Sequence, residues 1–138
     1  MSHSIEQDLF REKVARDDIS AYIGDLLVRQ RRVNQEVFSF SEDFLQPGAT
    51  VIDACAGPEG SLLAGALHAY RWYGNEISER FAQNLKATGG EAASVTLADF
   101  LHSPYRAGFA DAVYFIFAMN HLVRHQETIR EAHRITNQ

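Results

Sequence analysis

The sequence has little of what several classes of protein require. Cys55 is the only cysteine among 138 residues, so no internal disulfide can form and a reducing compartment is expected. No apolar run approaches the roughly 20 residues that span a bilayer, and residues 1–6 lack a signal-peptide pattern. A basic excess is also lacking, because the formal charge is −5, which argues against a nucleic-acid-binding surface. These absences predict a cytoplasmic protein that binds neither nucleic acid nor a membrane.

The remaining composition is that of an ordinary folded domain. Hydrophobic residues make up 46% of the chain and charged residues 22%. A chain of 138 residues can bury one sizeable core and is too short for two comfortable domains. We therefore expect a single core.

The most informative stretch is Val51-Ile52-Asp53-Ala54-Cys55-Ala56-Gly57-Pro58-Glu59-Gly60. Its apolar, β-branched beginning predicts a strand over residues 50–54, and an Ala/Leu-rich segment over 61–70 has helical spacing. A strand, a tight turn of small residues and a helix form the phosphate- or nucleoside-binding corner of a doubly wound α/β sheet. Small residues let a ligand approach the backbone, and the helix N-terminus offers unpaired N–H groups.

The rest of the chain continues this alternation of helices and strands. Apolar spacing predicts helices over residues 5–32, 33–45, 79–88 and 127–135, with a break near residues 17–20. β-rich runs predict strands over residues 71–78 and 94–98, and an apolar, aromatic strand begins near Phe109. Such alternation indicates a parallel sheet with helices on its faces.

Acidic residues lie at the ends of three predicted strands. Asp53 is near the end of the first, Glu76 is near the end of the second, and Asp99 follows the third. Glu76 lies 19 residues beyond Gly57, close to the ~20-residue offset at which an acid binds the ribose hydroxyls. Two carboxylate oxygens match a vicinal diol, which is the physical reason for an acid at this place.

Each acid also has a purely structural interpretation. Asp53 is alternatively a turn residue bonded to nearby N–H groups. Glu76 is alternatively an exposed acid that caps the helix beginning near Ser78. Asp99 is alternatively the first residue of a turn that leads to residues 102–104.

The stretch from Asp53 resembles the first motif of the Rossmann-like, class I S-adenosylmethionine (SAM)-dependent methyltransferases, usually Asp/Glu-x-Gly-x-Gly-x-Gly. Asp53 and Gly57 match it, whereas Cys55 and Glu59 stand where glycine is usual. The later segments resemble the next three motifs in order and spacing. Glu76-Ile77-Ser78 resembles the second motif and Asp99-Phe100 the third. The strand leading into Met119-Asn120-His121-Leu122 resembles the fourth motif of small-molecule methyltransferases. The last helix is similar to the Arg-Glu-x-x-Arg-Ile pattern that follows in this family.

The resemblance implies a Rossmann-like methyltransferase sheet of about four parallel strands, with helices on both faces and an N-terminal helical segment. Residues 1–32 would form a helical lid and residues 33–138 the SAM-binding domain. The implied reaction is methyl transfer from SAM to a small-molecule acceptor, with His121 or Tyr22 as base or orienting group. The implied SAM-binding residues are Asp53, Ala54, Cys55, Gly57, Glu76, Ile77, Asp99, Phe100 and Phe115. We expect no metal, because His121 and His125 have no third ligand.

The usual continuation of the family, a Pro-Gly-Gly turn and three further strands, does not follow residue 136. An apolar fourth strand left at a sheet edge is an aggregation hazard. We therefore expect an unstable free monomer, and a homodimer or heteromer that covers the open edge. The alternative function is a non-catalytic, methyltransferase-like subunit that binds or stabilises a partner. A nicotinamide-dependent dehydrogenase is less well matched, because Pro58-Glu59 and Asp99 suit it poorly.

Overall fold

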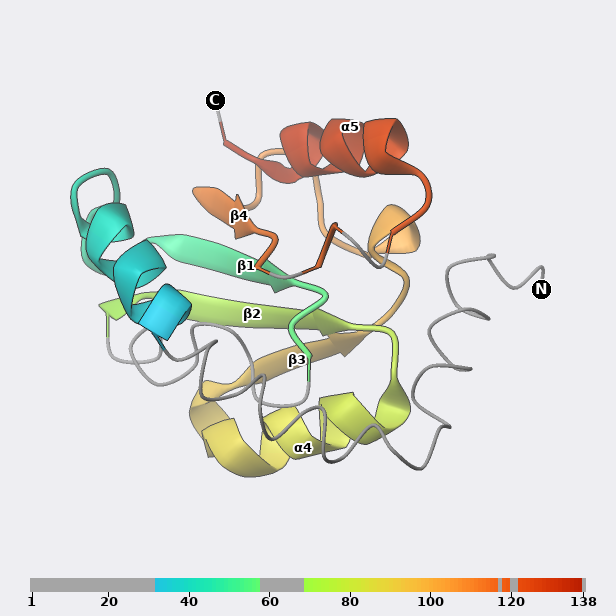
Figure 1. The fold of residues 1–138 in the computed structure, drawn as a ribbon, viewed down its shortest axis with the longest axis horizontal. Helices are drawn as coiled ribbons and strands as arrows, with labels where there is room; N and C mark the ends of the chain where they lie inside the picture. The colour runs from blue at the N-terminus through green and yellow to red at the C-terminus, as the bar shows by residue number, and fades with distance from the viewer. Residues whose placement is uncertain (1–31, 58–68, 117, 120–121, 138) are drawn as a thin grey trace.

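The computed structural model describes residues 32–57, 69–116, 118–119 and 122–137. Its centre is one sheet of four strands (Figure 1), which are β1 (Thr50–Ala54), β2 (Arg71–Glu76), β3 (Ser94–Leu97) and β4 (Ala112–Tyr114). The strand order is β3-β2-β1-β4, and every pairing is parallel. The predicted α/β fold with about four parallel strands is confirmed.

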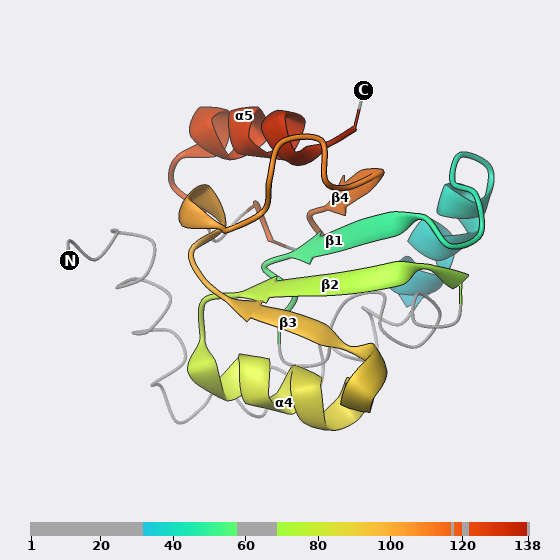
Figure 2. The ribbon, with the colours of Figure 1, turned by 180° about the vertical axis from the view of Figure 1, so that it is seen from behind.

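Helices cover both faces of this sheet. The helical segments of the described residues are α4 (Glu79–Gly89), α5 (His125–Ile135), residues 32–42 and the short 3-10 helices η1 (Gly90–Ala92) and η2 (Phe100–His102). Leu85 of α4 packs with Val51 on one face, whereas Ile135 of α5 packs with Ile52 on the other. Neighbouring residues of β1 thus enter opposite cores, as the two-residue period of a strand requires. In Figures 1 and 2, α4 lies beside the outer strand β3 and α5 lies beside the outer strand β4.

The fourth strand is shorter than its apolar run predicts, because β4 has only three residues. Beside it, Ala110 forms an isolated parallel bridge with Thr136, after α5. The Ala110 N–H donates to the Ile135 carbonyl at 3.0 Å, and the Asn137 N–H donates to the Ala110 carbonyl at 2.6 Å. The chain after α5 therefore lies beside the segment that leads into β4.

Trp72 and Gly74 of β2 pack closely against each other, just before Asn75 and Glu76. Trp72 is 1% exposed, and a Cβ built on Gly74 would lie 2.3 Å from its Cη2 atom. Only glycine leaves room for the indole at this position. The packing fixes β2 immediately before Asn75 and Glu76.

Two expectations concern other parts of the chain. The predicted lid, residues 1–32, lies outside the described residues except for residue 32. In the part of the chain that is described, no helix is long and apolar enough to cross a membrane.

Candidate functional site

Three buried acidic side chains lie where the C-terminal ends of the parallel strands meet. Asp53 is the penultimate residue of β1, Glu76 is the last residue of β2, and Asp99 follows β3 by two positions. The parallel register pairs Asp53 with Gly74 and Glu76 with Leu97, so these strand ends share one edge. The exposed fractions of the three acids are 0%, 1% and 6%. The structure thus brings the three predicted acids to one rim.

Glu76 joins the loops that follow β1 and β2. Its Oε1 accepts from the Gly57 N–H at 3.3 Å, and its Oε2 accepts from the N–H groups of Ile77 at 2.7 Å and Ser78 at 3.2 Å. Burial raises the pKa of Glu76 to about 7, although these three N–H groups favour the charged form. The interpretation of Glu76 as an exposed helix cap is wrong. Ser78 is the cap of α4, because its Oγ accepts from the Phe81 N–H at 3.3 Å.

Hydrogen bonds through β2 hold the neighbouring loops in place. The Ala56 N–H donates to the Asn75 carbonyl at 2.9 Å, and the Ala98 N–H donates to the Glu76 carbonyl at 2.9 Å. The Asn75 side chain, 1% exposed, donates from Nδ2 to the Ala98 carbonyl at 3.1 Å. The sequence analysis did not single out Asn75. The available signal was a polar residue within a buried strand, because such a group needs a partner.

The loop after β1 passes twice through left-handed backbone. Gly57 has φ of 76°, and Cys55 has φ of 54°, the only positive φ of a residue other than glycine in the described ranges. Left-handed φ is free for glycine and costs roughly 1–2 kcal/mol for residues with a Cβ. Cys55 therefore departs from glycine in its side chain while the backbone keeps a conformation that favours glycine.

Asp99 begins the turn that leads into η2. Its Oδ1 accepts from the Leu101 N–H at 3.1 Å, so the turn interpretation is correct for this oxygen. Its Oδ2 accepts no hydrogen bond from the residues that the structure describes, although His102 Nδ1 lies 3.5 Å away. The next residue, Phe100, is 2% exposed, and its ring packs edge-to-face on Phe115 with centroids 5.1 Å apart. One oxygen of Asp99 thus builds the loop, and the other is buried beside His102.

Three residues named from the sequence lie outside the described residues: Tyr22, Glu59 and His121. Their roles stay predictions. His125 is described, and its Nε2 lies 2.9 Å from the Met119 carbonyl oxygen. Among the described residues, no group of three or more His, Cys, Asp or Glu side chains could hold a metal ion.

A strand order of 3-2-1-4, a glycine-containing loop after β1 and acids at successive strand ends are typical of Rossmann-like nucleotide-binding folds. The sequence profile described as a methyltransferase domain matches residues 52–138. The chain belongs to this family. Its sheet and helices form the Rossmann-like methyltransferase fold, in a shorter version than that of the similar solved structures.

Solved structures share the fold at low sequence identity. A chain in the complex between the Haloferax volcanii Trm112 methyltransferase activator and a proposed methyltransferase is 24% identical, with a TM-score of 0.69 over 88% of this chain and 55% of that one. A proposed SAM-dependent methyltransferase of Methanococcus maripaludis is 15% identical, with a TM-score of 0.68 over 100% and 64%. The [4+2]-cyclase SpnF is 18% identical, with a TM-score of 0.61 over 67% and 36%.

At these identities the similarity shows the fold alone. The chain spans less than two thirds of the length of each of these three structures. No curated protein sequence matches it significantly.

Proposed function

We propose that the chain binds SAM at the rim of the three acids and transfers its methyl group to a small-molecule acceptor. The observation that carries this proposal is the position of Glu76. Its buried carboxylate reaches the backbone of the Gly57 loop at 3.3 Å, so the acid of β2 and the small-residue loop of β1 border one space. In a nucleoside site of this type, such a carboxylate accepts hydrogen bonds from the ribose hydroxyls, and the backbone of the small-residue loop lies close to the ligand.

We assign to the other rim residues the roles that the family resemblance implies. Asp53 faces the ammonium group of SAM, directly or through water. Asp99 uses Oδ2 to accept from the adenine amino group, and the Phe100 N–H faces the ring. Residues beside these acids line the rest of the pocket, namely Ala54, Cys55, Gly57, Ile77 and Phe115.

Catalysis in this proposal is mainly alignment. The sulfonium methyl is held in line with a desolvated acceptor nucleophile, and fixing two reactants in this way lowers the entropic part of the barrier. His121 and Tyr22 are the proposed base or orienting groups.

The active form we propose is a homodimer or a complex with a partner subunit that covers an open edge of the sheet. Among the described strands, β4 pairs on one side only, with β1. The similar Haloferax volcanii structure is a complex with an activator protein, which supports a partner. A light-scattering mass of more than one chain is expected; a cooperatively melting monomer would contradict this part of the proposal.

A second candidate function is a non-catalytic, methyltransferase-like subunit that binds or stabilises a partner. Cys55 at a backbone position that favours glycine supports it, because a cysteine in place of the usual glycine alters the loop after β1 that would contact the ligand.

The fold is also compatible with other chemistry, since a [4+2]-cyclase has a similar structure.

Calorimetric titration of the full chain with SAM and with its demethylated product separates the two functions. We expect micromolar binding, and at least a 30-fold loss in Glu76→Ala, because charge-assisted hydrogen bonds to the ribose disappear. Glu79→Ala is the matched control, since Glu79 is an exposed acid in the first turn of α4, and its affinity should be unchanged. Absence of binding in every assembly state would reject the enzyme and favour the non-catalytic subunit.

A further inference from the structure

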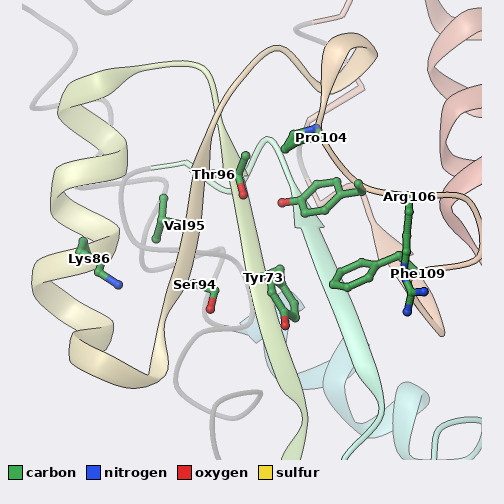
Figure 3. A pocket seen from close by; sticks show the side chains of 9 residues that line it. Tyr73, Lys86, Ser94, Val95, Thr96, Pro104, Arg106 and Phe109 are labelled. Atoms are coloured by element: carbon green, nitrogen blue, oxygen red, sulfur yellow. The ribbon is translucent and has the colours of Figure 1, made fainter.

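An open groove lies beside β3, away from the rim of the three acids. Its volume is about 560 Å³, and it contains none of the acids of the rim. The residues that line it come from β2, β3, α4 and the segment before β4 (Figure 3): Tyr73, Lys86, Ser94, Val95, Thr96, Pro104, Tyr105, Arg106 and Phe109. The groove is thus a feature of the sheet edge and does not belong to the nucleoside site.

One wall of the groove is aromatic and held in place. The rings of Tyr105 and Phe109 stack with centroids 5.7 Å apart, and Tyr73 meets Phe109 edge-to-face at 5.0 Å. Arg134 of α5 donates from Nη2 to the Tyr105 carbonyl at 2.7 Å and accepts at its own carbonyl from the Gly108 N–H at 3.0 Å. The wall is therefore preformed, which reduces the entropy lost on binding.

The charge of the groove is opposite to that of the chain. The chain carries a formal charge of −5, yet Lys86 and Arg106 line the groove, and none of the acidic residues that the structure describes does. The Arg106 guanidinium lies 5.9 Å from the Phe109 ring centroid, and Lys86 Nζ donates to the Ala93 carbonyl at 2.7 Å. An ammonium group has three donors, so Lys86 keeps two for an incoming group. This arrangement favours an anionic occupant.

The edge of β3 is suited to receive another strand. Among the described strands, β3 pairs only with β2, and Ser94–Leu97 contains neither proline nor a charged residue. Natural sheet edges are usually protected by such residues, because an unpaired edge offers free N–H and C=O groups to another chain. Leu97 is also 54% exposed, so the strand presents apolar surface next to its backbone groups.

We propose that this groove docks an extended, acidic segment of a partner protein, which pairs with β3 through its backbone. Strand addition provides backbone hydrogen bonds, and alternate side chains of the segment meet the aromatic wall and the two cations. This docking site lies at β3, the sheet edge opposite β4. It is therefore separate from the cover that the proposed function places beside β4, and either can hold without the other.

The test lets the full chain select its own ligand from random 12-residue peptides. We expect the selected peptides to be enriched in acidic residues around β-branched or aromatic ones, and to slow amide hydrogen exchange at Ser94–Leu97. Enrichment without acidic residues, protection at Ala112–Tyr114 instead, or failure to select any peptide would each overturn the proposal.

Variants then test the two cations. Because exposed ion pairs contribute modestly, the selected peptide should bind about tenfold more weakly to the Lys86→Ala/Arg106→Ala double variant, and affinity should fall as salt rises. Arg130→Ala is the matched control, since Arg130 is an exposed arginine of α5 outside the groove, and it should bind normally. Arg106→Glu alone should also weaken binding, which keeps the test valid if the loss of Lys86 disturbs folding. Unchanged affinity in Arg106→Glu would contradict the proposal.

SAM titration of the same variants separates this proposal from the proposed function. The groove variants should bind SAM as the wild type does, while Glu76→Ala should still bind the peptide. A variant that loses peptide binding but keeps SAM binding tests the groove proposal alone. A variant that loses SAM binding but keeps peptide binding tests the SAM-binding proposal alone.

Discussion

The two faces of β2 differ in how completely they are closed. On one face, Trp72 lies against Gly74 and is 1% exposed, and Glu76, two residues further along the same face, is equally buried. On the other face, Asn75 is also 1% exposed, but Tyr73 is only half-buried and lines the groove beside β3. The closed face holds the Glu76 carboxylate in one position at the rim, beside the Gly57 loop. The open face leaves sheet surface that a second molecule can cover.

The largest expected effect is that of Gly74→Ala on stability. A Cβ at this position would lie 2.3 Å from Trp72 Cη2, and Trp72 is 1% exposed, so the indole and its neighbours must shift to admit the methyl group. We expect the free energy of unfolding to fall by about 3 kcal/mol, measured by urea denaturation. Gly108→Ala is the control, because φ there is 69° but no atom lies within 4 Å of the new Cβ, so a loss of about 1 kcal/mol is expected. Equal losses in the two variants would show that the closed face is not tightly packed.

The second prediction concerns the pH dependence of the free energy of unfolding that Glu76, on the closed face, produces. Its pKa is raised from 4.5 to about 7 by burial, so the unfolded chain loses this proton at lower pH than the folded chain does. The free energy of unfolding should therefore fall as pH rises from about 4.5 to 7, by up to about 3 kcal/mol, and stay low above that range. Urea titrations of Glu76→Gln between pH 5 and 8 should lack this fall, whereas Glu79→Gln should retain it. Parallel curves for wild type and Glu76→Gln would contradict the assignment.

SAM affinity should have the opposite pH dependence. Ribose hydroxyls donate to the ionised carboxylate, so binding favours loss of the proton and should strengthen as pH rises through about 7. Calorimetry at pH 6 and pH 8 checks this, and Glu76→Gln should show no such change. Tighter binding of the wild type at pH 6 would be inconsistent with a carboxylate that accepts from the ligand.

A smaller effect is expected from Asn75→Ala, which acts where β2 meets the loop after β3. The substitution leaves the partly buried Ala98 carbonyl without its 3.1 Å partner, at a cost of about 2 kcal/mol. Thermal or urea unfolding measures the change. Asn84→Ala, on the exposed surface of α4, should change stability by less than about 0.5 kcal/mol. A neutral Asn75→Ala variant would show that the loop does not depend on this side chain.

The smallest expected effect is that of Cys55→Gly. Glycine removes the strain of φ at 54° but also makes the unfolded chain more flexible, so a net gain of only about 0.5 kcal/mol is expected. Cys55→Ala keeps the Cβ and should give no gain. Stabilisation by alanine equal to that by glycine would indicate that the thiol, and not the backbone, is unfavourable.

The elements were predictable where one local pattern dominates. The strand over residues 50–54 and the helix over residues 79–88 agree with β1 and α4, because their apolar periods are clear and Gly90, with φ of 60°, ends the helix. The length of β4 was overestimated. Ile116 and Ala118 are buried although they lie outside the strand, and composition alone does not distinguish a buried strand from a buried loop.

The sequence by itself determined that three acids would lie at or just after the ends of parallel strands. They would therefore meet on one side of the sheet, because parallel strands end on the same side. Only the tertiary structure decided that Glu76 is buried against the Gly57 N–H, that Cys55 takes a left-handed φ, and that a groove opens beside β3. The physical reason is the range of the interactions. Periodicity and strand direction are local properties of the chain, whereas burial, pKa and surface shape arise from segments that meet only after folding.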